Sequence, residues 1–407
     1  MAEGRRPTIA MISSIAYSLH NFRGPLIRDL VAAGWRVLAL APDYDETLRE
    51  RVRALGAEPV DYSLSRTGMH PLRDALDMVR LARQLRRLRV DAVFTFFIKP
   101  VIYGTLAATL ARVRRRYAMI AGLGYVFTPG REPMSRRRRV LRRAVSALYR
   151  LGLARAHVVF FQNQDDIDEF VSRGIVDRAK CVRLNGTGVD LERLQPSTPT
   201  RQPVTFLLMA RLLREKGIVE FVEAARLLRR DHPDARFVLL GGLDPNPGGL
   251  SLAAVEGWRD EGAVEWPGHV DDVLPWLRDS SVFVLPSYRE GAPRSTQEAM
   301  ALGRAVVTTD AVGCRETVVD GVNGFLVEVR DVPTLVAGMR RFLDEPALID
   351  RMGEASRRLV EERFDVRRIN ATMLHAMGIV APANAGPAAS SLPVAPSGSL
   401  SPVCGEC

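Results

Sequence analysis

Apolar runs alternate with amphipathic patterns along most of this chain. The runs "TIAMISSIA", "RVLALAP", "DAVFTFF" and "HVVFFQ" fall in the first half, and "VTFLLMA", "RFVLLGG" and "SVFVLP" fall in the second. Stretches with helical periodicity lie between them, for example residues 22–34, 165–174 and about 215–230. Continuous apolar strands separated by such helices are typical of a parallel sheet with both faces covered. The pattern therefore predicts an α/β fold with doubly wound, Rossmann-like sheets.

The length and one interruption of this pattern indicate two domains. The chain has 407 residues, which is more than one typical core accommodates. The alternation stops at the polar, Pro-rich stretch "DLERLQPSTPTRQP". We therefore expect a first domain over residues 1–190, a linker over 191–203 and a second domain over 204–365, facing each other across a cleft. Residues 366–379 would form a helix that could cross back to the first domain, and the Ala/Pro/Ser-rich residues 380–407 a disordered tail.

Charge narrows the class of protein more than composition does. Hydrophobic residues make up 47% of the chain and charged residues 26%, which is ordinary for a soluble globular protein. The net charge of +10 predicts an anionic partner: nucleic acid, a phosphate-bearing substrate or anionic lipid. No run approaches ~18 apolar residues, so we expect no membrane-spanning helix. The N-terminal run is explained better by a first strand than by a signal peptide.

The four cysteines do not suggest a disulfide framework. Cys181, Cys314, Cys404 and Cys407 are few and scattered, which favours a reducing compartment. The final Cys404-Gly-Glu-Cys407 resembles half of a metal site, but it has no second pair and no nearby His. We therefore expect no metal site and no cofactor.

Arginines concentrate in residues 112–119 and 135–156. In the second stretch one helical face carries Leu141, Ala144, Val145 and Leu148, while Arg136 to Arg139, Arg142 and Arg143 crowd the other positions. This stretch is either a solvated helix that packs its apolar face on the first sheet, or a helix that rests on anionic lipid. A nucleic-acid-binding protein is a third class, but aromatic residues are only 7% and none of the usual modules is present.

Two glutamates follow an apolar strand in "SVFVLPSYREGAPRSTQEAM". Ligands of open α/β sheets bind beyond the carboxyl ends of the strands, so this loop is a candidate site. Pro293 suits the first turn of a helix over about 294–302, whose positive N-terminus favours a phosphate. Glu290 and Glu298 are either ordinary surface and helix residues or part of this site. Arg211 and Lys216, after another strand, are either solvated cations or partners of a diphosphate.

The combination of these motifs resembles a known family. "ARLLREKG", "YREGAPRSTQEAMALGRAVVTTDAVGCRETVVDGVNGFLV" and the Glu290-seven-residues-Glu298 spacing are similar to retaining glycosyltransferases of the family-four (group 1) type, which have the GT-B fold. The resemblance covers about residues 200 to 365. The details "EGAPRS", "GCRETV", "FFQNQDD", "LNGTGVD" and "NFRGPLIRDL" are most similar to bacterial enzymes that extend sugars on polyprenyl diphosphate.

The resemblance implies roles for particular residues. As catalytic candidates, Arg211 and Lys216 would hold the donor diphosphate and Glu290 would face the donor sugar, while Glu298 would bind the ribose. The other donor-binding candidates are Gly291, Ala292, Arg294 and Ser295, through backbone groups, and His269 and Val270, near the base.

The first half departs from the family pattern. Many members carry a Gly-Gly turn after the first strand, where this chain has "SSIAYSLHNFRG". The acceptor-side candidates are His20, Asn21, Arg23, Lys99, Gly122 and Tyr125, and ordinary polar roles at a helix start are an equal alternative for the first three.

The resemblance implies transfer of a sugar, with retention, from a nucleotide sugar to a lipid-linked saccharide. The donor would be a UDP-linked hexose or N-acetylhexosamine, and no side chain is assigned as general base. We expect the protein in the cytoplasm at the inner face of the plasma membrane, held by Arg136–Arg143. The alternatives are a nucleotide-sugar epimerase of the same fold and the basic nucleic-acid-binding protein. The sugar, the acceptor and the linkage position depend on pocket shape and stay open.

Overall fold

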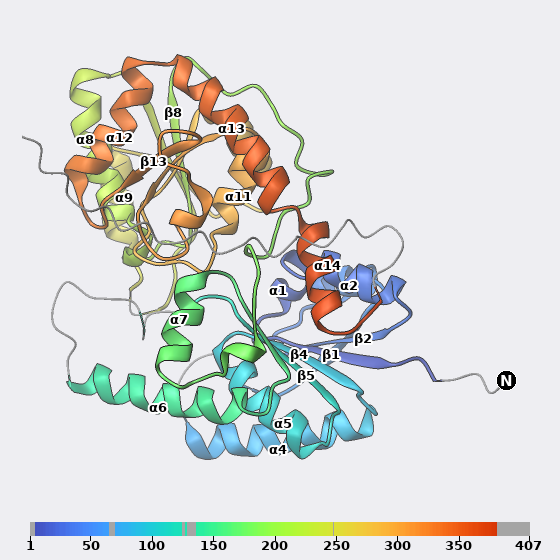
Figure 1. The fold of residues 1–407 in the computed structure, drawn as a ribbon. Helices are drawn as coiled ribbons and strands as arrows, with labels where there is room; N and C mark the ends of the chain where they lie inside the picture. Colours follow the sequence, from blue (N-terminus) through green and yellow to red (C-terminus); the bar gives the residue numbers. More distant parts are fainter. Residues whose placement is uncertain (1–4, 65–69, 124–126, 128–135, 247, 381–407) are drawn as a thin grey trace, which may run out of the picture.

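The first half of the molecule is a seven-stranded parallel sheet in the order β3-β2-β1-β4-β5-β6-β7 (Figure 1). The computed structural model describes residues 5–64, 70–123, 127, 136–246 and 248–380. The strands are β1 (Thr8–Ile12), β2 (Arg36–Ala41), β3 (Glu58–Asp61), β4 (Ala92–Phe96), β5 (Arg115–Ile120), β6 (Val158–Phe161) and β7 (Cys181–Arg183). The helices are α1 (Ala16–Asn21), α2 (Gly24–Ala32), α3 (Glu46–Arg53), α4 (Pro71–Arg87), the π-helical η1 (Pro100–Gly104), α5 (Thr105–Leu110), α6 (Arg136–Leu153), α7 (Gln164–Ser172) and the 3₁₀ turn η2 (Arg178–Lys180).

The second half is a six-stranded parallel sheet in the order β10-β9-β8-β11-β12-β13. Its strands are β8 (Thr205–Met209), β9 (Arg236–Leu240), β10 (Glu265–Gly268), β11 (Val282–Leu285), β12 (Ala305–Thr309) and β13 (Gly324–Val327). Its helices are η3 (Arg214–Lys216), α8 (Ile218–Asp231), α9 (Leu252–Asp260), α10 (Leu274–Arg278), α11 (Arg294–Ala301), η4 (Arg315–Thr317), α12 (Val332–Asp344) and α13 (Ala347–Arg363), before the final α14 (Val366–Ala376). The predicted architecture of two doubly wound parallel sheets is confirmed.

Alternate residues of the first sheet enter different cores, as parallel strands buried on both faces require. Ile9 and Met11 pack in the cluster that contains side chains of α1, α2, α3 and α14. Ala10 and Ile12 pack on the other face, with side chains of α4 and α5. Helices α6 and α7 cover this same face, where Ile120 and Phe161 join their cluster. Helices α4, α5 and α6 therefore lie side by side on one surface of the first domain (Figure 1).

The chain order reverses once in each sheet, between β1 and β4 and between β8 and β11. In doubly wound sheets the crevice at such a reversal is where ligands bind. A ligand is therefore expected beside the segments that follow β1, β8 and β11.

The chain returns to the first domain at its last helix. Asn370 of α14 donates a hydrogen bond of 2.6 Å to Asp29 of α2, and Tyr117 of β5 donates one of 2.6 Å to the carbonyl of Met377. Ile369, Met373 and Leu374 are buried in the core of the first domain. The expected tail is residues 380–407, and all of it after Val380 lies outside the described residues.

Two element boundaries differ from the sequence prediction. The apolar run 8–16 is not one strand, because β1 ends at Ile12 and Ser13 turns the chain by hydrogen bonding to Ile15. The helix expected from about 215 is divided into η3 and α8 by Gly217. Gly217 has a φ of 72°, a left-handed conformation that favours glycine.

Candidate active site

Two adjoining cavities lie between the domains, at the reversal points of the sheets. The larger has a volume of about 430 Å³ and the smaller of about 230 Å³. Both are lined by Asn21 and Phe22 from the first domain and by Met209, Ala210, Arg211, Arg294 and Glu298 from the second. The cavities therefore form one continuous cleft with contributions from α1, the segment after β8, and α11.

The smaller cavity contains a lysine and a glutamate that the sequence singled out. Lys216 donates a hydrogen bond to Oε1 of Glu290, and the Ser287 hydroxyl donates a second one to the same oxygen at 2.8 Å. Both Lys216 and Glu290 are largely buried, with 18% and 13% of their side chains exposed. These contacts fix the Glu290 carboxylate at one end of the cleft.

Two glycines allow the backbone to bring this pair together. A Cβ atom at Gly217 would collide with the carbonyl oxygen of Pro286, so only glycine lets η3 pack against the end of β11. Gly313, with a φ of 79°, lies against the carbonyl groups of Glu290 and Gly291 in the same way. Close backbone approach therefore positions both Lys216 and the Glu290 loop.

The N-terminus of α11 opens onto the smaller cavity. Its N-cap residue is Pro293, which has no side-chain acceptor, and Pro293, Arg294 and Ser295 line the cavity. The first N–H groups of the helix and its dipole therefore favour an anion at this point. Gly291 and Ala292 precede this turn, where Ala292 is buried and the Gly291 carbonyl accepts a hydrogen bond from Asn163 at 2.7 Å.

Arg294 and Glu298 pair across one turn of α11, at 2.9 Å. Arg294 also donates to the backbone carbonyl of Asn21 at 2.6 Å, and its guanidinium lies 5.2 Å from the centre of the Phe22 ring. The sequence suggested a backbone role for Arg294, and the structure adds a side-chain contact with the first domain.

The larger cavity holds the remaining donor-side candidates of the second domain. His269 and Val270 line it, directly after β10. Arg211 lines both cavities and pairs with Asp244 at 2.6 Å, with about half of its side chain exposed. Arg211 is therefore accessible from the cleft while it is paired with Asp244.

Three of the first-domain candidates lie at the cleft or at the contact between the domains. His20 and Asn21 line the larger cavity, and burial, with Arg51, Arg193 and Arg28 nearby, lowers the pKa of His20. Gly122 lies at the domain contact, where an added Cβ would come within 3.3 Å of the Gly291 nitrogen.

Arg23 and Lys99 line neither cavity. Arg23 is buried beneath the cleft against Met119 and the Phe94 and Phe96 rings, and burial lowers its pKa to about 9. Lys99 pairs with Asp74 of α4 at 2.9 Å. Tyr125 lies outside the described residues.

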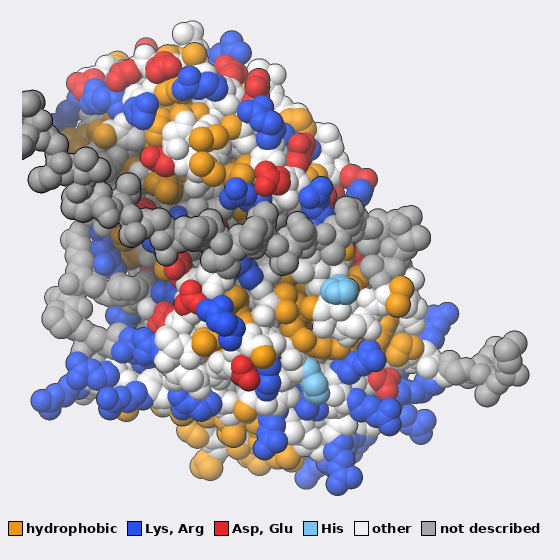
Figure 2. Space-filling view, viewed as in Figure 1, with side chains coloured by type: hydrophobic (Ala, Val, Ile, Leu, Met, Phe, Trp, Pro, Cys, Tyr) orange, Lys and Arg blue, Asp and Glu red, His pale blue; other side chains and the backbone are white. Residues whose placement is uncertain are grey.

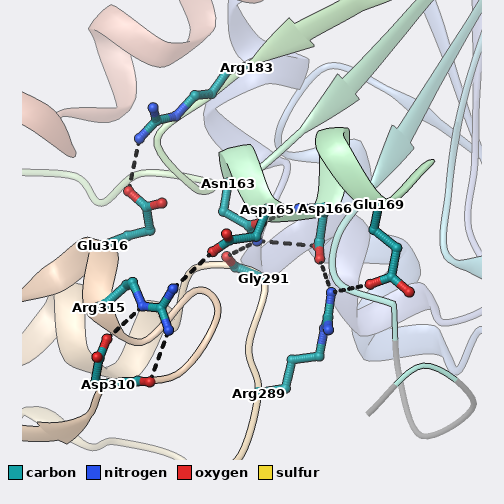
Figure 3. A network of polar contacts seen from close by, with 10 residues as sticks. All are labelled: Asn163, Asp165, Asp166, Glu169, Arg183, Arg289, Gly291, Asp310, Arg315 and Glu316. Atoms are coloured by element: carbon teal, nitrogen blue, oxygen red, sulfur yellow. Dashed lines mark hydrogen bonds and ion pairs between the residues drawn. The ribbon is translucent and has the colours of Figure 1, made fainter. Parts of the chain in front are cut away.

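A polar network joins the loop before Glu290 to helix α7 of the first domain (Figure 3). Arg289 forms ion pairs with Asp166 and Glu169, and the Arg289 and Asp166 side chains are almost fully buried. Asn163, the N-cap of α7, donates to the carbonyl of Gly291 on the other side of Glu290. Arg315 and Arg183 add ion pairs with Asp165 and Glu316. The domains therefore meet on both sides of Glu290.

The sequence did not predict this network, and it did not predict two of the cations that line the larger cavity. Arg28 and Arg193 line the larger cavity beside His20, and Arg193 belongs to the stretch interpreted only as a linker. A signal existed for α7, because "NQDD" begins one residue after the end of the β6 strand. No comparable signal exists for Arg193, whose position depends on how the domains pack.

Among the described residues, no group of three or more His, Cys, Asp or Glu side chains is placed to hold a metal ion. Cys404 and Cys407 lie outside the described residues. In the same part of the chain, no helix has the length and apolarity needed to cross a bilayer.

Each half of the chain matches a family of known proteins. Residues 26–193 match the family described as Glycosyltransferase Family 4, and residues 203–345 match Glycosyl transferases group 1. The chain is 29% identical over 354 residues, 84% of this chain and 90% of the relative, to N,N'-diacetylbacillosaminyl-diphospho-undecaprenol alpha-1,3-N-acetylgalactosaminyltransferase of Campylobacter jejuni. It is 24% identical, over 68% of this chain and 72% of the relative, to UDP-Gal:alpha-D-GlcNAc-diphosphoundecaprenol alpha-1,3-galactosyltransferase of Escherichia coli.

The fold has similar solved structures. The Anabaena protein HepE in complex with UDP and glucose superposes with a TM-score of 0.70 at 16% identity, over 92% of this chain and 100% of that one. The predicted GT-B fold is therefore confirmed.

Proposed function

Since this chain is a glycosyltransferase of the GT-B fold, with a family-four first half and a group 1 second half, we propose that it transfers a sugar from a nucleotide sugar to a lipid-linked saccharide. The names of two relatives support this acceptor class, because both act on sugars carried by a diphospho-undecaprenol lipid. The first of them aligns with most of both chains. The pathway would be the assembly of a polysaccharide, O-antigen or glycoprotein glycan.

The proposed donor is a UDP-linked hexose or N-acetylhexosamine that occupies both cavities. Its base would lie in the larger cavity beside His269 and Val270, and its ribose hydroxyls at Glu298, which lines both cavities. Its sugar would lie in the smaller cavity beside Glu290. The uridine base is supported by the name of the Escherichia coli relative and by the UDP in the HepE complex.

The chemistry proposed for the cleft is stabilisation of the leaving diphosphate. Cleavage of the sugar–phosphate bond builds positive charge on the sugar and negative charge on the diphosphate. Arg211, Lys216 and the N-terminus of α11 line the smaller cavity and would carry that negative charge. Lys216 has three N–H donors, so it can hold Glu290 and a phosphate oxygen together.

We also propose that transfer retains the anomeric configuration. A diphosphate oxygen would take the proton of the acceptor hydroxyl on the face that the leaving group vacates, so no side chain acts as general base. Glu290 would hold the donor sugar hydroxyls in the orientation that leaves this face open to the acceptor. Closure of the domains around the cleft would exclude water that could otherwise hydrolyse the donor.

The location proposed for the protein is the inner face of the plasma membrane, where a lipid-borne acceptor is anchored. The arginines of residues 136–143 at the start of α6 would contact anionic headgroups.

The observation that carries the proposed function is the Lys216–Glu290 pair at the N-terminus of α11, inside an interdomain cleft. The test is a panel of nucleotide sugars, assayed with a membrane extract that contains lipid-linked saccharides, with mass analysis of the lipid product. A product heavier by one sugar supports the proposal, and enzymatic digestion of that product with α- or β-specific glycosidases tests retention.

Two alternative functions give other results in the same material. An epimerase would convert the nucleotide sugar without any acceptor. A nucleic-acid-binding protein would retard DNA or RNA in a gel at moderate salt and transfer no sugar.

A further inference from the structure

Helix α4 exposes a line of apolar side chains to solvent. Leu72, Leu76 and Val79 have a spacing of four and three residues, which places them along one side of a helix, and 84% of the Leu72 side chain is exposed. Figure 2 shows hydrophobic side chains gathered over α4 at the lower edge of the molecule. The core-facing side of α4 is formed by other residues, Leu81, Ala82 and Leu85. The outer line of α4 therefore faces solvent, most of all at Leu72 and Leu76.

Helix α6 repeats this arrangement on the same surface of the domain. Its predicted apolar face is mostly core, because Leu141, Val145 and Leu148 pack on the sheet, whereas Ala144 is exposed. A second line, Val140, Ala144, Ala147 and Leu151, faces outward. With Leu110 at the end of α5, these helices hold six of the thirteen large hydrophobic side chains that the structure exposes in its described part.

The charges of this surface are all positive. Helices α4, α5 and α6 contain only two carboxylates, Asp74 and Asp77, and both are buried. Exposed arginines surround the apolar lines: Arg73, Arg80, Arg83, Arg86 and Arg87 on α4, and Arg136, Arg139, Arg143 and Arg150 on α6. A shallow groove of about 460 Å³ at α6 is lined by Arg139, Arg142, Arg143, Ser146, Arg150 and Arg173. The surface therefore complements a partner that is anionic at its face and apolar below it.

The apolar line begins at the edge of the sheet that carries the carboxyl ends of the strands. Helix α4 follows β3, so its first turns lie at the carboxyl ends of the parallel strands. The ion pair between Asp74 in the first turn of α4 and Lys99, just beyond β4, fixes this position. Leu72 and Leu76 stand on either side of Asp74 in the sequence.

We propose that the outer faces of α4, α5 and α6 form one membrane-docking surface, in which Leu72, Leu76 and Val79 enter the acyl layer of an anionic bilayer while the arginines contact its headgroups. This deepens the proposed function and rests on its lipid-linked acceptor. Nucleic acid offers the phosphates but no apolar layer for exposed leucines, and this surface exposes no aromatic side chain for stacking on bases. Binding to a membrane interface uses both the apolar line and the arginines, because apolar insertion and attraction to anionic lipid both contribute to the affinity.

Sedimentation with vesicles of equal parts phosphatidylglycerol and phosphatidylcholine tests the surface, without donor or acceptor present. The wild-type protein should bind at low salt and retain part of its binding at about 1 M salt, where screening acts over ~3 Å but insertion persists. The variant Leu72→Ser/Leu76→Ser/Val79→Ser should lose the salt-resistant part and bind at least about tenfold more weakly. The variant Arg139→Glu/Arg143→Glu should lose the salt-sensitive part.

A matched control replaces exposed side chains of the same types on the second domain. The variant Leu227→Ser/Leu252→Ser/Val322→Ser should bind vesicles like the wild type, and thermal unfolding should show that all variants are folded. As a second measurement, an environment-sensitive dye on Leu76→Cys should shift to shorter emission wavelengths on vesicles, whereas the same dye on Leu252→Cys should not. Vesicle binding by the α4 variant equal to wild type, or an equal loss in the control variant, overturns the proposal. So does wild-type binding that disappears completely at high salt, or binding to duplex DNA while vesicles stay unbound.

Transfer assays with two acceptors distinguish a failure of the docking surface from a failure of the proposed function. The α4 variant should still transfer sugar to a short-chain, water-soluble prenyl diphosphate acceptor, while transfer to the same saccharide in vesicles falls about tenfold or more. A wild-type protein that docks through α4 but transfers no sugar to either acceptor would contradict the proposed function alone. Normal transfer to the vesicle acceptor by an α4 variant that also sediments normally would contradict the docking surface alone.

Discussion

At the scale of single residues, the proposed diphosphate site depends on two cations that each pair with one carboxylate. Lys216 contacts Glu290 and Arg211 contacts Asp244, and both cations line the smaller cavity. We expect Lys216→Ala and Arg211→Ala each to lower kcat by about 10²-fold or more, because each removes a donor from the leaving diphosphate. Steady-state kinetics on folded protein measure this loss.

The control for these variants is Lys180→Ala. Lys180 lies in η2 of the first domain, donates to the carbonyl of Ala154 and lines neither cavity. Near-normal turnover by both Arg211→Ala and Lys216→Ala would refute the assignment of the diphosphate site.

Substitutions of the two glutamates should affect different quantities, donor affinity for Glu298 and kcat for Glu290. Glu298 lines both cavities near the proposed ribose, so Glu298→Gln should weaken donor affinity by about tenfold, the loss of one good hydrogen bond to a charged acceptor. Glu290 lies at the proposed reacting end, so Glu290→Gln should mainly lower kcat. Titration calorimetry with the nucleotide sugar measures the affinities, and unchanged affinity in Glu298→Gln contradicts the ribose assignment.

His20 should couple donor binding to pH. Its pKa is lowered by burial and by nearby arginines, and a bound diphosphate would offset those positive charges and raise the pKa again. Binding would then take up a proton, so donor affinity should rise as the pH falls through the pKa that His20 has in the complex. The diphosphate of a nucleotide sugar does not titrate near neutral pH, so the slope would come from a group of the protein, and His20 is the candidate.

Calorimetry at several pH values tests this coupling with His20→Gln and with the control His232→Gln, at the end of α8. The slope should vanish only in His20→Gln. An identical slope in wild type and His20→Gln would show that another group titrates.

The residues of the cleft were predictable where a motif follows a strand directly. Arg211, Lys216, Glu290 and Glu298 were expected at one site and the structure brings them to one cleft, although their roles stay predictions. Arg23 was an acceptor-side candidate, yet it packs beneath the cleft on Phe94 and Phe96. Which side of a short helix faces a cavity depends on tertiary packing, and the chain between β1 and α2 has no periodicity long enough to indicate it.

At the scale of elements, the contact between α7 and the loop before Glu290 should matter for both stability and activity. Removing Arg289 leaves Asp166 buried and without its ion-pair partner, and burial already raises the pKa of this carboxyl group. We expect Arg289→Ala to lower the free energy of unfolding by about 3 kcal/mol. It should also lower kcat about tenfold, because Glu290 follows Arg289 directly.

A double variant separates these two effects. Arg289→Met with Asp166→Leu replaces the buried pair by apolar side chains and should recover most of the lost stability. Its kcat should remain low if Arg289 orients the Glu290 loop. Full recovery of kcat together with stability, measured by denaturant unfolding and by turnover, would show that the pair only stabilises the fold.

Most elements were predictable because buried parallel strands are continuous apolar runs. The exceptions are short segments such as η3 and α1, where Gly217 or Ser13 divides an apparently continuous pattern. The arginine-rich α6 was correctly expected as a helix, but its exposed apolar line differs from the one that the sequence suggested. Periodicity identifies an apolar side of a helix, whereas only packing shows which of two such sides meets the sheet.

At the scale of the whole molecule, several contacts join the two domains around the cleft. Arg294 reaches the carbonyl of Asn21, Asn163 reaches the carbonyl of Gly291, and α14 packs on the first domain after leaving the second. The proposed donor site belongs mainly to the second domain, and the proposed membrane surface belongs to the first. This arrangement would present a lipid-borne acceptor to a donor held from the opposite side.

The central claim is transfer of a sugar from a nucleotide sugar to a lipid-linked saccharide. The most direct measurement is mass analysis of the lipid fraction after the purified protein is incubated with UDP-sugars and a defined polyprenyl-diphosphate saccharide. The account predicts a lipid product extended by one sugar with the wild-type protein, formed about 10²-fold or more slowly by Lys216→Ala. An unchanged lipid fraction across the donor panel, with the nucleotide sugar epimerised or left intact, would contradict the account.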